Sequence, residues 1–167
     1  MLNPTDVILE TWNRNTTVVL NILNALPEGG IDARDTGGEW TVAHHLSDMQ
    51  GANVHWLQKS APDFALGLEV LYTEDESSPL GFVAERDIAK IKIGFQTASD
   101  AIARAVKHHT ETEAQFGEVY EHPIFFLQHM LWHQAYHTGQ IIWALKQSGM
   151  RFTDDQTFDM IWKELRR

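Results

Sequence analysis

The sequence of 167 residues contains no cysteine. Disulfide bridges, cysteine-based zinc sites and iron–sulfur clusters are therefore excluded, and so is a thiol nucleophile supplied by the chain itself. A metal ion could be bound only through histidine, aspartate, glutamate or backbone oxygen. The candidates for a metal site are therefore nine histidines and 23 acidic residues.

Basic residues are also few, with 13 lysines and arginines and a formal net charge of −10. Nucleic-acid affinity depends on basic side chains that displace counterions, so we expect no nucleic-acid partner. No stretch approaches the roughly 18 consecutive apolar residues of a membrane span, and the first residues lack the basic and apolar segments of a secretory signal. We expect a cytoplasmic protein with a small-molecule substrate and no membrane partner. The length predicts one domain over residues 1–167.

Helical periodicity dominates the sequence, and no run of alternating apolar residues predicts a strand. Turn residues separate four long helices and one short terminal helix, predicted over residues 5–26, 41–59, 88–109, 123–148 and 153–165. Thr5 and Thr41 are expected to cap the first two helices. Residues 61–81 predict a long connection with at most one helical turn. The predicted fold class is all-α, a four-helix bundle with a long crossover between helices two and three and a short C-terminal helix.

Three histidines recur every four residues in the fourth predicted helix, namely His129, His133 and His137. They lie on one face of the helix, which also carries apolar residues and therefore points inward. Two neutral imidazoles at positions i and i+4 can share one cation, so His133 and His137 are candidate metal ligands. The alternative is a hydrogen-bonded polar core, because nine histidines produce such spacings by chance.

A third ligand is expected from the second predicted helix, which can face the fourth. Its candidates differ in their direction on the helix: His45 lies close to the apolar side, His44 and His55 lean toward the polar side, and Asp48 lies between them. A carboxylate suits a site with two imidazoles on Zn²⁺, Ni²⁺, Mn²⁺ or Fe²⁺. Helical spacing alone leaves the choice between Asp48 and His45 open.

The segment HQAYHTGQI at 133–141, taken together with the Trp40-Thr41-Val42 start of the second helix, resembles the DinB/YfiT-like superfamily, whose four-helix members are regarded as metalloenzymes. The resemblance implies that His133 and His137 are metal ligands. In that superfamily the third ligand is a histidine eight residues after the tryptophan, where this chain has Asp48. The resemblance therefore implies Asp48 as the substitute, with His44 or His45 as the fallback third ligand. Gln140 is expected to hydrogen-bond to the ligands.

The superfamily includes transferases and isomerases that use low-molecular-weight thiols such as bacillithiol or mycothiol. The resemblance thus implies a thiol-dependent transferase or detoxification enzyme with an open divalent metal site and a metal-bound water or thiolate as nucleophile. The thiol would come from a cosubstrate, and His44 or His129 could be the base. The alternatives are a metal-dependent hydrolase and a noncatalytic dimeric stress protein. A homodimer could form through Trp132, Tyr136 and Trp143, although these could equally pack inside the chain.

Overall fold

Four long helices make up most of the computed structural model, which describes residues 3–166. They are α1 (Pro4–Ala25), α2 (Val42–Ser60), α3 (Ile88–Thr112) and α4 (Pro123–Gln147). Short turns of 3₁₀ helix, η1 (Gly30–Asp32) and η2 (Pro62–Phe64), flank α2. The C-terminal segment continues from α5 (Asp154–Thr157) through the π-helical η3 (Phe158–Trp162) into α6 (Lys163–Arg166).

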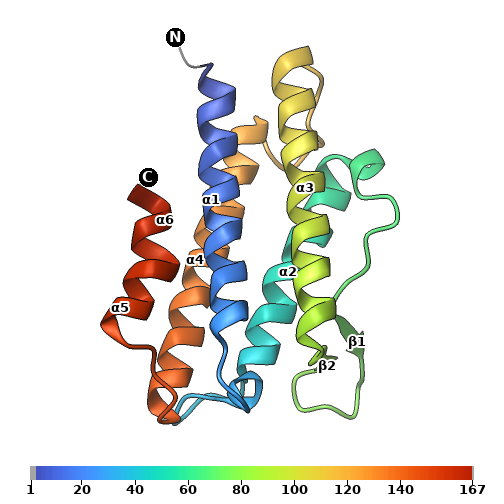
Figure 1. The fold of residues 1–167 in the computed structure, drawn as a ribbon. Helices are drawn as coiled ribbons and strands as arrows, with labels where there is room; N and C mark the ends of the chain where they lie inside the picture. The colour runs from blue at the N-terminus through green and yellow to red at the C-terminus, as the bar shows by residue number, and fades with distance from the viewer. Residues whose placement is uncertain (1–2, 167) are drawn as a thin grey trace.

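The four long helices pack side by side, with α1 and α2 each in contact with both α3 and α4. Figure 1 shows that α1 and α4 run in one direction, whereas α2 and α3 run in the other. The C-terminal segment packs along α1. The prediction of an all-α fold is confirmed, and the predicted contact between the second and fourth helices is present as the α2–α4 pair.

A side chain caps the start of each long helix, and in α2 the capping residue is the one that the sequence predicts. The Thr41 hydroxyl accepts a hydrogen bond from the His44 backbone N–H, and the His44 ring accepts one from the Thr41 N–H. The prediction for α1 was wrong by two residues, because Asn3 accepts the hydrogen bond from the Thr5 N–H. Asparagine is a strong capping residue, and Pro4 is then favoured as the first helical residue.

The connection between α2 and α3 contains a small antiparallel hairpin, so the expectation of no strand was wrong. Strands β1 (Tyr72–Glu74) and β2 (Phe82–Ala84) are each three residues long, which is too short to produce an alternating pattern. Two buried side chains of α2 fix the connection: the Gln50 amide accepts from the Leu71 N–H at 3.0 Å and donates to the Glu69 carbonyl at 2.8 Å, and the Ser47 hydroxyl donates to the Leu71 carbonyl at 2.6 Å. The hairpin is therefore attached to the helix that carries Asp48.

The apolar core consists of two clusters. Buried polar residues lie between the two clusters, and these polar residues occur at a similar level of each long helix. The Gln134 amide of α4 joins the half-buried Asn15 to the buried Asn53, accepting from Asn15 Nδ2 at 2.5 Å and donating to Asn53 Oδ1 at 3.3 Å. Thr16 of α1 donates to the Ser99 hydroxyl of α3 at 3.1 Å. These polar contacts fix how the four helices are aligned along their length. His133 directly precedes Gln134 in α4, so it lies next to this polar layer.

Candidate metal centre

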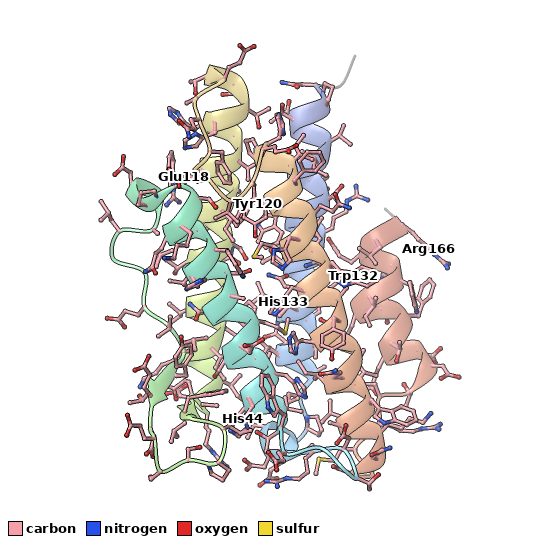
Figure 2. All side chains as sticks on the ribbon, turned by 180° about the vertical axis from the view of Figure 1, so that it is seen from behind. His44, Glu118, Tyr120, Trp132, His133 and Arg166 are labelled. Atoms are coloured by element: carbon pink, nitrogen blue, oxygen red, sulfur yellow. The ribbon has the colours of Figure 1, made fainter. Side chains whose placement is uncertain are left out.

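The α2–α4 contact brings together Asp48, His133 and His137, one carboxylate and two imidazoles. Asp48 Oδ2 lies 3.2 Å from His133 Nε2 and 3.0 Å from His137 Nε2. One ligand atom from each of the three residues lies within 4.8 Å of the others. His137 is buried, whereas Asp48 and His133 are partly exposed. The group is therefore anchored in the core and open toward solvent on one side, and Figure 2 shows His133 in the space between α2 and α4.

Two histidines favour the ionised form of the Asp48 carboxyl. Burial alone would raise the pKa of the carboxyl, but the hydrogen bonds from His133 and His137 outweigh burial and hold the pKa well below its usual range. An ionised carboxylate facing two imidazole nitrogens is the donor set that divalent transition metals prefer in proteins.

Two further observations test whether these residues suit a metal ion. Metal–ligand bonds of about 2.0–2.2 Å place neighbouring ligand atoms about 3 Å or more apart, and both Nε2 atoms lie at such distances from Asp48 Oδ2. His133 Nδ1 is buried and has no hydrogen-bond partner among residues 3–166. Within residues 3–166, His133 therefore interacts with the group through its Nε2 atom and has no hydrogen-bond partner at Nδ1. The residues present fit a three-ligand site for Zn²⁺, Mn²⁺, Fe²⁺ or Ni²⁺.

Neither fallback ligand is part of this group. The His44 Nδ1 atom lies 2.7 Å from the Thr41 hydroxyl in the helix cap, near the start of α2. His45 Nδ1 instead lies 3.0 Å from His137 Nδ1, on the side of that ring opposite Asp48. The structure therefore places His45 behind a predicted ligand rather than among the ligands.

In the structure His45, and not Gln140, hydrogen-bonds to a member of the ligand group, and the role of Gln140 beside the ligands stays a prediction. Gln140 lines a cavity of about 300 Å³ together with His45, Trp40 and His137, and its side-chain amide forms no hydrogen bond within residues 3–166. The Trp40 ring lies parallel to the His137 ring, with centroids 5.9 Å apart and 13° between planes. The sequence offered one clue to this arrangement, since His45 lies on the apolar side of α2 and a buried imidazole needs a polar partner.

His129, one of the two predicted bases, lies one helical turn before His133. Its Nδ1 atom lies 2.6 Å from the Tyr120 hydroxyl, and its ring packs against Trp56. Burial and, to a smaller extent, His133 lower the pKa of His129. The pKa of His44 is also lowered, mainly by burial and to a smaller extent by the charges of Arg34 and Arg86. Neither histidine belongs to the ligand group, and the base role of both stays a prediction.

A cleft of about 520 Å³ opens directly on Asp48 and His133. It runs between α2 and the β1–β2 hairpin, and we call it the hairpin cleft; its remaining lining residues are Gly51, Ala52, His55, Trp56, Tyr72, Glu74, Glu76, Gly81 and Phe82. A larger cavity of about 830 Å³ lies along the α3–α4 loop and does not include any residue of the ligand group. The hairpin cleft therefore gives access to Asp48 and His133, whereas the smaller cavity beside Gln140 reaches His137.

The profile of the DinB family matches residues 1–164. The chain belongs to the DinB family. Searches among curated proteins and among solved structures found no match for this DinB protein. None of its helices within residues 3–166 is long and apolar enough to cross a membrane.

The DinB chain also exposes the aromatic side chains that the sequence assigned either to a homodimer contact or to the interior. Trp132, Tyr136 and Trp143 on α4 are 76%, 56% and 50% exposed. The alternative that they pack inside the chain is therefore wrong, and the homodimer stays a prediction.

Proposed function

We propose that this protein is a metal-dependent enzyme that binds a divalent cation through Asp48, His133 and His137 and acts on a low-molecular-weight thiol in transfer or detoxification chemistry. One observation carries the proposal: two imidazole Nε2 atoms meet a single ionised carboxylate oxygen at 3.0 and 3.2 Å, at the floor of a cleft open to solvent. A site with three protein ligands leaves positions for substrate, which is typical of catalytic metal sites.

A divalent cation bound there would supply Lewis acidity, which lowers the pKa of a coordinated water or thiol toward neutrality. Asp48 contributes a fixed negative charge, and His45 fixes the orientation of His137 from behind. Because the chain has no cysteine, the reactive thiol belongs to the cosubstrate. In the transfer, the thiol sulfur forms a bond to an electrophilic carbon of the acceptor, the leaving group departs with its bonding electron pair, and the thiol proton passes to solvent.

The metal part of the proposal is tested by elemental analysis of the purified protein and by thermal unfolding with added Zn²⁺, Mn²⁺, Ni²⁺ or Fe²⁺. We expect a bound metal, and a melting temperature that rises on metal addition because the ion binds the folded state. The variant His133→Gln should lose this increase, whereas His108→Gln, which changes an exposed histidine of α3, should retain it. A protein that holds no metal and is not stabilised by any of these ions would contradict the proposal.

The reaction class is tested separately, with the metal-loaded protein. A transferase consumes 1-chloro-2,4-dinitrobenzene only when a thiol is present, and the thioether product and chloride appear in equal amounts. The metal-dependent hydrolase remains the alternative: it would release p-nitrophenol from p-nitrophenyl acetate without any thiol. Activity that survives His133→Gln in either assay would show that the ligand group is not involved.

A further inference from the structure

One wall of the hairpin cleft consists of aromatic side chains of the hairpin that pack against α2. Gly51 of α2 lies under the Tyr72 ring, and a Cβ atom at position 51 would lie only 2.7 Å from Tyr72 Cε1. The Tyr72 ring packs edge-on against Phe82 of the facing strand, with centroids 5.4 Å apart. Because Ser47 and Gln50 also attach the connection to α2, these rings are held beside Asp48 and His133.

The charge of this cleft has one sign. Asp48, Glu74 and Glu76 line it, and its lining includes no lysine or arginine among residues 3–166. Glu74 and Glu76 are exposed and form no ion pair within the described part of the chain. A divalent cation would offset two of these three negative charges, so the cleft would keep one negative charge, with the two glutamates at its rim. An anionic ligand would be repelled there, whereas a cation would gain from the carboxylates and from the faces of nearby aromatic rings.

We propose that the hairpin cleft binds a small organic cation, a substrate that carries an ammonium group facing Glu74 and Glu76 and that presents its reactive end to Asp48 and His133. This substrate class rests on the proposed function, because the reaction centre is the proposed metal site. Where the thiol itself occupies the cleft, it is an amine-bearing thiol rather than a carboxylated one. The charge and the aromatic rings of the hairpin cleft thus select the substrate, and the ligand group acts on the reactive end of that substrate.

The charge preference is measured first without any thiol, by titrating the full-length protein with benzylamine, benzyl alcohol and benzoate before and after metal loading. In the metal-free protein, benzylamine should bind at least about ten-fold more tightly than the other two, a factor equal to about 1.4 kcal/mol. The double variant Glu74→Gln/Glu76→Gln should lose the preference. The matched control Glu28→Gln/Glu121→Gln removes the same charge from exposed positions outside the cleft and should retain it. Equal or tighter benzoate binding, or a preference that survives Glu74→Gln/Glu76→Gln, overturns the proposal.

A second variant tests the aromatic wall. Gly51→Ala should displace the Tyr72 ring and weaken benzylamine binding, while metal affinity stays unchanged. If benzylamine binding is unchanged although a structure of the variant shows the ring displaced, the wall has no part in recognition and the proposal is overturned.

Matched thiols separate this proposal from the proposed function. Cysteamine, 2-mercaptoethanol and 3-mercaptopropionate carry the same thiol with a positive, neutral or negative partner group. With Co²⁺-loaded protein, thiolate coordination gives an absorption band that reports the proposed metal chemistry. If all three thiols fail to give the band, the thiol chemistry fails while the benzylamine result still decides the charge preference. If the band appears at lower concentrations of 3-mercaptopropionate than of cysteamine, the charge preference fails while the thiol chemistry holds.

Discussion

The Nδ1 atoms of His45 and His137 lie 3.0 Å apart in the buried space between α2 and α4. Only one of the two nitrogens can carry the shared proton, because a hydrogen bond between two ring nitrogens needs one donor and one acceptor. When His137 Nε2 donates to Asp48, its Nδ1 must accept a proton from His45. When His137 Nε2 is instead a metal ligand, its Nδ1 carries the proton and donates it to His45. The hydrogen bond between His45 and His137 can therefore form both in the metal-free protein and in the metal-bound protein.

Replacing His45 with Ala should weaken metal binding by about 10- to 100-fold, the usual effect of removing the hydrogen-bond partner of a ligating histidine. Burial and, to a smaller extent, His137 lower the pKa of His45 to about 4, so at neutral pH the ring is uncharged and can accept. Isothermal titration with Zn²⁺ measures the change. His45→Gln restores an acceptor and should recover part of the affinity, whereas His108→Ala changes an exposed histidine outside the ligand group and the hairpin cleft and should have no effect. Unchanged affinity in His45→Ala would exclude the positioning role.

The stability of the metal-free protein should depend on pH through Asp48. The folded-state pKa of this carboxyl is lowered relative to its ordinary value of 3.8, so its stabilising contribution is present above that value and is lost as the pH falls below it. Urea unfolding at pH 7 and near pH 3 should therefore show a larger loss of stability for the natural protein than for Asp48→Asn. Equal losses in the two proteins would show that the carboxylate does not interact with the histidines.

Removing the Gln134 amide should lower the free energy of unfolding without changing any of the three candidate metal ligands. Gln134→Ala leaves Asn15 and Asn53 without their partner, and Asn53 Nδ2 already lacks one within residues 3–166. We expect the free energy of unfolding to fall by about 1–3 kcal/mol. Gln128→Ala on the exposed side of α4 should change it by about 0.5 kcal/mol or less. Similar values for the two variants would mean that the polar layer contributes nothing specific.

The long helices could be predicted because their information is local. Apolar spacing and the Thr41 cap identify α2, and Pro123 marks the first residue of α4, so both elements begin where predicted. The hairpin could not be predicted in this way. Its strands are three residues long, and what holds the connection in place is the pairing of Ser47 and Gln50 with backbone groups about 20 residues away along the chain.

The ligand group was partly predictable for a similar reason. The spacing of His133 and His137 places both on one helix face, but choosing between Asp48 and His45 required the register of α2 against α4, which helical periodicity does not contain. The family resemblance supplied that register. The structure brings Asp48 to the two histidines and gives His45 a different position, as the partner of His137.

We propose that Asp48 takes the place of the third histidine ligand of the resembled superfamily. Calorimetric titration of Zn²⁺ into the natural protein, Asp48→Asn and Asp48→His tests it most directly. We expect one site per chain in the natural protein, affinity at least about 100-fold weaker in Asp48→Asn, and binding retained in Asp48→His, because an imidazole is also a good ligand. Asp48→Asn that binds Zn²⁺ as tightly as the natural protein would show that Asp48 is not a ligand.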